Sequence, residues 1–244
     1  MAGQIQAVSP GRVLVTRPQP AASKTALKLA SKGFEPLLLP LSRTVPLSFV
    51  IPEDGFAALT VTSANAFLHV EEERLKPFLG LPLFAVGGGT ASAGRAAGFQ
   101  QVIDGGGDAV RLAAAMRRDL PEKARVLYLA GRVRQPVFED EVRAAGLDME
   151  TIDVYDTQAV SYAPTVLRDL LDGAPFVAVM LYSGVAAESF VEVMQGIEPP
   201  IDEKTRFLCI SARVADRLPP LWRANALVAE HPDEDALFRL VAKL

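Results

Sequence analysis

Short apolar runs alternate with amphipathic segments along almost the whole chain. Residues 126–130 and 176–182 are continuous apolar runs rich in strand-forming residues, and such runs are typical of strands covered on both faces. Residues 20–31 carry alanine and leucine at helical spacing and are followed by Gly33, a helix-ending signal. Because strands and helices alternate, the pattern predicts an α/β fold built on parallel sheets with right-handed crossovers.

The same reasoning divides the chain into elements. The predicted strands are residues 13–15, 37–41, 57–62, 81–86, 102–104, 126–130, 149–155, 176–182, 207–210 and 227–229. The predicted helices are residues 20–31, 64–75, 90–97, 109–120, 136–145, 166–171, 185–194, 212–218 and 233–244, with Asp108 and Asp233 as caps. Residues 43–54 and 156–164 are expected to be connecting chain, and residues 4–11 a loose leader.

The first part of the chain is repeated in its middle. The run RVLVTRP at residues 12–18 matches RVLYLAG at residues 125–131, and Gly33 matches Gly146. The offset is 125 − 12 = 113 for the first match and 146 − 33 = 113 for the second, which indicates a duplication. A second pair repeats in the same way: residues 57–67 with 177–187, and residues 83–91 with 207–215.

These segments, called A, B, A′ and B′ in chain order, can build two similar domains in two ways. B and A′ together would form a middle domain, while A and B′ would close a second domain from both chain ends. This arrangement is consistent with two connections, near residues 40–52 and 155–164. Pairing of A with B and of A′ with B′ stays open at this point.

Composition excludes several classes of protein. The 244 residues can bury a large core, as one big domain or two small ones. The single cysteine, Cys209, excludes an intramolecular disulfide and lies in an apolar run, which predicts a buried, inert thiol in a reducing cytoplasm. No apolar run approaches the roughly 20 residues of a membrane span, and no signal-peptide pattern is found. With a net charge of −4, nucleic acid is not an expected partner.

The residues that follow the predicted strands form a consistent set. Ligands of parallel sheets bind outside the carboxyl ends of the strands, and here each end opens a helix whose first N–H groups lack helical partners. Helix N-termini and guanidinium groups favour anions, so the set suits a polyanion, although serine, threonine and glycine are also simply good caps and turns. The candidate binding residues are Arg17, Ser63, Asn65, Gly87, Thr90, Gly131, Arg132, Arg134, Ser183, Gly184 and Ser211.

The motifs of other enzyme classes fail in this sequence. The glycines at residues 87–89 lack the last glycine of a dinucleotide-binding turn, and the stretch after them lacks the lysine of a phosphate-binding loop. His69 and His231 have no metal-ligand spacing and are expected to be surface or core histidines, so no metal is expected. Neither Ser63 nor Ser183 lies in a nucleophile elbow, so a hydrolase triad is unsupported.

Tyr155 is a different kind of candidate. It ends a predicted strand at the inferred junction of the domains, next to Asp156 and Thr157. A phenol at that place could donate a proton to a leaving group. The alternative is a hinge tyrosine that packs between the domains.

Taken together, these segments resemble the uroporphyrinogen-III synthase family over nearly the whole chain. The matching pieces, in order, are VLVTRP with a helix and GFE, TSAN, AVGGGTA, DGGGDAVRL, VLYLAGR, VYDT and LYSG. The resemblance implies two similar α/β domains, each a parallel sheet flanked by helices, joined by a two-stranded linker with the active site between them. The implied boundaries are residues 42–156 for the middle domain and residues 1–41 with 157–244 for the discontinuous one.

The resemblance also implies a reaction. The family closes hydroxymethylbilane, a linear tetrapyrrole polycarboxylate, with loss of water and inversion of the last pyrrole ring, and a spiro intermediate is the usual proposal. It implies a hydro-lyase without cofactor or metal, a monomer, and transient contact with porphobilinogen deaminase. Tyr155 would be the general acid, and the candidate binding residues would hold substrate carboxylates. The family's threonine-rich turn is absent at residues 210–214, and whether Arg213 replaces it is left open.

Two other classes remain alternatives. One is a non-catalytic two-domain protein that binds a small anionic ligand, and the other is a nucleotide-dependent transferase on the same architecture. The failed glycine motifs count against the transferase.

Overall fold

The computed structural model describes residues 11–52, 55–195 and 201–244, so most of the leader expected at residues 4–11 lies outside the described residues. By its internal contacts the chain separates into two compact units. Unit 1 contains the chain up to Arg43 together with Ala159–Leu244, and unit 2 contains Thr44–Gln158. Each unit has its own sheet and its own core.

Unit 1 is built on a parallel sheet. Its five strands within the described ranges follow the order β11-β10-β9-β1-β2, and each neighbouring pair is parallel. The strands are β1 (Arg12–Val15), β2 (Glu35–Leu38), β9 (Phe176–Leu181), β10 (Arg206–Cys209) and β11 (Ala226–Val228). Segment A therefore shares a sheet with B′, and the alternative pairing of A with B is not what the chain adopts.

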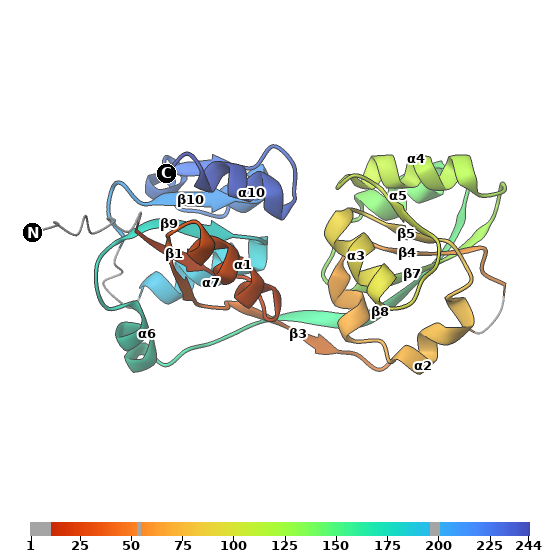
Figure 1. The fold of residues 1–244 in the computed structure, drawn as a ribbon, viewed down its shortest axis with the longest axis horizontal. Helices are drawn as coiled ribbons and strands as arrows, with labels where there is room; N and C mark the ends of the chain where they lie inside the picture. Colours follow the sequence, from red (N-terminus) through yellow and green to blue (C-terminus); the bar gives the residue numbers. More distant parts are fainter. Residues whose placement is uncertain (1–10, 53–54, 196–200) are drawn as a thin grey trace, which may run out of the picture. The chain divides into compact units, whose positions relative to one another are not determined.

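Helices cover both faces of the unit 1 sheet (Figure 1). Val13 and Val15 point to one face, where they pack on α1 (Ala21–Ser31) and α10 (Glu234–Val241). Leu14 points to the other face, and because both faces are covered the strand is apolar throughout. The helices of this second face are α6 (Pro164–Leu171), α7 (Gly184–Gln195), α8 (Ala212–Ala215) and α9 (Pro220–Arg223).

Unit 2 repeats the plan with a larger sheet. In the described part of the chain it has six strands in the order β3-β8-β7-β4-β5-β6, and those from β8 to β6 are parallel. The strands are β3 (Ser42–Pro46), β4 (Ala58–Val61), β5 (Leu83–Ala85), β6 (Val102–Asp104), β7 (Arg125–Gly131) and β8 (Asp148–Ala159). One face packs on η1 (Ala64–Leu68), α2 (Glu72–Leu75), η2 (Lys76–Phe78) and α3 (Gly88–Ala96), the other on α4 (Ala109–Asp119) and α5 (Val137–Ala144).

The chain passes between the units in two neighbouring strands. The boundary after Arg43 falls inside β3, and the boundary after Gln158 falls inside β8. Leu47 N–H donates to the Val154 carbonyl, and Val160 N–H donates to the Leu41 carbonyl. The partner on the β8 side thus moves forward along the chain as the partner on the β3 side moves back, so the two strands are antiparallel. The predicted fold class, including the two-stranded linker, is confirmed.

Several element predictions are wrong in detail. Residues 43–54 are not plain connecting chain, because β3 begins the stretch, and β8 continues to Ala159 into the second expected connection. The helix expected at residues 64–75 breaks after His69 into η1 and α2, since the buried Val70 turns the chain inward. The helix expected at residues 212–218 ends at Ala215, and α9 was not expected.

Other local predictions are confirmed. The Asp108 carboxylate accepts from Arg111 N–H at 3.0 Å and the Asp233 carboxylate from Ala236 N–H at 2.7 Å, and such caps stabilise a helix by about 1 kcal/mol each. Cys209 is buried, and burial raises the pKa of its thiol to about 12, so it is inert at neutral pH.

Candidate active site

The carboxyl ends of the unit 2 strands bring several predicted residues together. Because β4, β7 and β8 are parallel neighbours, the residues that follow them lie at one edge of the sheet. Ser63 follows β4, Gly131 ends β7, and Tyr155 lies beside Gly131 in the register of β8. The side chains of Ser63 and Asn65 lie near enough to the Tyr155 phenol to act on its pKa, which they lower. Four of the predicted site residues thus form one cluster.

The backbone is irregular where Tyr155 meets Gly131. Ala130 pairs with Asp153 but Gly131 pairs with Tyr155, so β8 holds one extra residue, Val154, at this point. Such bulges redirect side chains and are frequent beside active sites. A Cβ atom on Gly131 would lie 2.5 Å from the Tyr155 Cζ and 2.7 Å from its hydroxyl oxygen. Only a glycine leaves room for the phenol here.

The Tyr155 side chain is buried and stacked. Tyr155 is only 6% exposed. Its ring lies against the His69 imidazole, with 5.6 Å between the ring centroids and 29° between the ring planes. Burial raises the pKa of the Tyr155 phenol, and the smaller opposing effects of Ser63, Asn65 and the Arg134 charge do not cancel this. The phenol therefore keeps its proton at neutral pH and can act as a proton donor.

The two arginines after β7 differ in their surroundings. Arg134 donates to Glu139 Oε1 at 2.9 Å, to the Gly131 carbonyl at 2.9 Å and to Asp153 Oδ1 at 2.5 Å, so it braces the turn around Gly131. The Arg132 side chain is 57% exposed, and among the described residues its ion-pair partner is Asp156, at 3.4 Å. Arg132 is therefore the better placed of the two for an anionic ligand.

Gly87 and Thr90 lie at the next strand end of the same edge. Gly87 is the N-cap of α3, and the two glycines after it are exposed. A Cβ atom on Gly87 would lie 3.2 Å from the Gly107 Cα, so the two glycine turns approach closely. Thr90 is buried in the first turn of α3. The accessible donors here are backbone N–H groups, which suit a carboxylate.

The unit 1 candidates share the corresponding edge of their own sheet. Ser183 precedes α7 and accepts from Ala186 N–H at 3.1 Å, Gly184 begins that helix, and Ser211 is the N-cap of α8. Arg17 follows β1, and β1, β9 and β10 are parallel neighbours. Its guanidinium lies 4.4 Å from the Tyr182 ring centroid and pairs with Glu234 at 2.9 Å.

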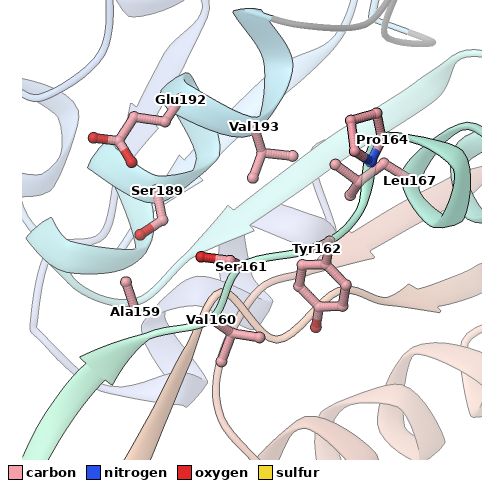
Figure 2. Close-up of a pocket in the computed structure, with 9 residues that line it drawn as sticks. All are labelled: Ala159, Val160, Ser161, Tyr162, Pro164, Leu167, Ser189, Glu192 and Val193. Atoms are coloured by element: carbon pink, nitrogen blue, oxygen red, sulfur yellow. The ribbon is translucent and has the colours of Figure 1, made fainter.

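Each unit contains a pocket. The unit 1 pocket, of about 290 Å³, lies between α6, α7 and the chain after β8, and none of the predicted site residues lines it (Figure 2). Tyr162 and Leu167 form its apolar part, and Ser161, Ser189 and Glu192 supply polar atoms. The unit 2 pocket, of about 440 Å³, includes Arg132, Arg134, Glu150, Thr151 and Asp153.

Two residues of the site were not predicted. His69 was expected to be an ordinary surface or core histidine, because it has no metal-ligand spacing to His231. Its Nε2 lies 2.7 Å from the Thr44 hydroxyl, and Thr44 belongs to β3, a strand expected to be connecting chain. No local signal marks either contact, since both depend on sheet order. Within the described ranges, no group of three or more metal-ligating side chains occurs.

These features define a class of protein: two parallel-sheet α/β units with anion-suited groups at their strand ends and a protonated tyrosine at one of them. The chain belongs to the uroporphyrinogen-III synthase family, because the family model described as "Uroporphyrinogen-III synthase HemD" matches residues 23–239. It is therefore an enzyme of tetrapyrrole biosynthesis that acts on a small tetrapyrrole substrate. Among the described residues, no helix combines the length and apolar character needed to cross a membrane.

Solved structures agree with this fold. The uroporphyrinogen-III synthetase of Helicobacter pylori is similar with a TM-score of 0.64 and 18% identity, covering 95% of this chain and 98% of that one. A mutant uroporphyrinogen III synthase of Thermus thermophilus is similar with a TM-score of 0.52 and 15% identity, covering 95% and 97%. Curated proteins give no significant match.

Proposed function

We propose that this protein closes hydroxymethylbilane to uroporphyrinogen III with Tyr155 as the general acid. The observation that carries the proposal is the Tyr155 phenol itself, which is buried, has a raised pKa and lies beside Ser63 and Asn65 at the strand ends. A group that stays protonated at neutral pH can give its proton to a departing hydroxyl. This makes the enzyme a cyclising hydro-lyase.

The proposed step balances without another reactant. The bond between the hydroxymethyl carbon and its oxygen breaks as the neighbouring pyrrole nitrogen supplies electrons, and the Tyr155 proton leaves with the oxygen as water. The last pyrrole ring then attacks the resulting cationic carbon through its already substituted α carbon, which gives a spiro intermediate. The bond from that α carbon to its original methylene bridge breaks, and the released methylene bonds to the other α carbon of the ring, so the ring is inverted. Restoring the aromatic pyrroles releases one proton, which returns to the phenolate. The overall change is loss of one water, so the proposal requires neither cofactor nor metal.

The remaining predicted residues are proposed to hold the substrate carboxylates. Arg132 and the N–H groups at Gly87 and Gly131 are proposed for unit 2, and Arg17, Ser183, Gly184 and Ser211 for unit 1. Arg17 and Arg134 already pair with carboxylates, so each would bind substrate through its remaining N–H groups. Each charge-assisted hydrogen bond contributes about 1.5–3 kcal/mol, and several together orient the substrate. Thr90, Ser63 and Asn65 are the remaining residues proposed to bind these carboxylates.

The test is a coupled assay with isomer analysis. Porphobilinogen deaminase makes hydroxymethylbilane in place, and the porphyrins are separated after oxidation. Uncatalysed closure gives the type I isomer, so type III that depends on this protein is the expected result. Tyr155→Phe is expected to lower turnover by about 10²–10⁴-fold, the usual contribution of a general acid. Folded protein that gives only type I would refute the synthase reaction and favour a non-catalytic binder of anions.

We further propose that the protein acts as a monomer in the cytoplasm. It would receive its substrate through transient contact with porphobilinogen deaminase. Size-exclusion chromatography with light scattering measures the oligomeric state. Turnover that survives dialysis against a chelator tests whether the reaction is independent of metal.

A further inference from the structure

Two groups outside β8 determine where the Tyr155 ring lies. Gly131 leaves the space that the phenol occupies, since any Cβ there would overlap the ring. The His69 imidazole stacks on the same ring, with centroids 5.6 Å apart. Ser63 and Asn65 lie near the hydroxyl end, so the ring face and the hydroxyl have different neighbours.

His69 is itself held in place. It is the C-cap of η1, with φ −121° and ψ 4°, where the chain leaves the helical path. Its Nε2 lies 2.7 Å from the Thr44 hydroxyl, and Thr44 lies on β3, the neighbour of the strand that carries Tyr155. The imidazole is therefore fixed through its edge by β3 and presents its face to Tyr155.

A proton donor works only at short range. The donor oxygen must approach the leaving oxygen to about 2.6–3.2 Å, and an error of about 1 Å can lower the rate by about 10²-fold. If stacking prevents the Tyr155 ring from tilting, the hydroxyl group keeps pointing in the same direction. An imidazole with one edge bonded is well suited to this, because the hydrogen bond sets the angle of the stacking face.

We propose that His69, held by Thr44, is a positioning residue that fixes the Tyr155 ring for proton transfer. This inference rests on the proposed function, in which Tyr155 is the proton donor. His69 does not touch the reacting atoms; it acts through Tyr155. The competing explanation is ordinary packing, in which His69 stabilises the fold without affecting the chemistry.

Matched variants separate positioning from packing. His69→Phe keeps an aromatic ring but loses the bond to Thr44, and Thr44→Val loses the same bond from the other side. Thr44→Ser keeps a hydroxyl and is the conservative rescue. His231→Phe is the control, because His231 is the other histidine of the chain and is exposed. Circular dichroism and thermal unfolding verify that each variant folds.

Turnover and a direct signal from Tyr155 are the two readouts. His69→Phe and Thr44→Val are expected to lower kcat about 10-fold with KM within about twofold, while Thr44→Ser keeps most of the turnover. In a Tyr155→Phe background, His69→Phe is expected to cause little further loss, because both act through one group. The ¹³Cζ resonance of Tyr155, assigned by its loss in Tyr155→Phe, is expected to move in the first two variants and not in Thr44→Ser or His231→Phe.

The outcomes separate this inference from the proposed function. Type III formation with unchanged kcat and Tyr155 resonance in His69→Phe and Thr44→Val would overturn the inference alone. An equal loss of turnover with and without the Tyr155 hydroxyl would show a packing role and overturn it as well. Wild-type protein that forms only type I would overturn the proposed function, and this inference with it.

Discussion

At the residue scale, the site depends on one missing side chain as much as on the groups present. Gly131 has no φ in the left-handed region, so its backbone conformation does not require glycine. The requirement is steric, because the Tyr155 ring occupies the place of a Cβ. The glycine was predicted as a donor of an N–H group to an anion, and the structure adds a second reason for it.

Gly131→Ala tests this steric requirement. The added methyl would lie 2.5 Å from the Tyr155 Cζ, so the phenol has to move. We expect turnover to fall by about 10–100-fold and stability to fall by about 1–3 kcal/mol from overpacking. The measurements are the isomer assay and urea unfolding. Gly80→Ala is the matched control, since a Cβ there meets nothing within 4 Å, and it should leave both quantities nearly unchanged.

At the element scale, the sequence predicts strands and helices well where one apolar pattern decides them. β6 and the helices α1 and α4 fall within a residue of their predicted bounds, since their apolar positions and caps are local. β3 was missed because Pro46 argues against a strand, yet at the edge of a sheet a proline is tolerated. η1 and α2 were merged because no proline or glycine marks the break near Val70.

The residues of the candidate site likewise fall into those that local sequence predicts and those that depend on tertiary contacts. Tyr155, Ser63 and Asn65 could be found from their positions at strand ends, because parallel strands end at a common edge. The His69–Thr44 contact could not, since it requires β3 to lie beside β8 and the helix to break at residue 69. The ion pairs of Arg134 with Glu139 and Asp153 also depend on the tertiary fold, whereas the sequence predicted Arg134 only as a residue that binds substrate carboxylates.

The contact of α1 with α10 gives a pH prediction. Burial raises the pKa of Glu234, but bonds from Lys28 and Thr25 and the charges of Arg17 and Lys28 outweigh it, so the net pKa is lowered. A lowered carboxyl pKa stabilises the fold above the unfolded value of about 4.3 and loses this contribution as pH falls through the folded value. Glu234→Gln should therefore reduce stability at pH 7 and flatten its decline below about pH 4.5.

Urea unfolding of wild type and Glu234→Gln at several pH values measures the effect. The curves should converge in acid, because wild-type Glu234 is then protonated as well. Glu188→Gln is the control, since that carboxylate is exposed and pairs with Arg217, which is exposed as well. An unchanged difference between wild type and Glu234→Gln from pH 7 to pH 3 would contradict the prediction.

At the scale of the whole molecule, one unit is continuous in sequence and the other is built from both ends of the chain. This difference suggests which fragment of the protein can fold alone. Residues 44–158 are continuous in sequence and contain a sheet with apolar clusters on both faces. Unit 1 is instead closed by the first and last parts of the chain. We propose that the two units are independent domains, with boundaries near the predicted residues 41–42 and 156–157.

An excised fragment of residues 44–158 is expected to fold alone, because it retains both apolar clusters of its sheet. It should give a cooperative thermal transition and dispersed amide resonances, yet form no type III isomer, since the Arg17, Ser183, Gly184 and Ser211 groups are absent. The matched control is residues 11–122, a fragment of similar length that joins segments A and B and so divides both sheets. That fragment should lack a cooperative transition. If the control folded cooperatively and the 44–158 fragment did not, the proposed domains would be wrong, and the stability of each unit would have to depend on chain outside its own sheet.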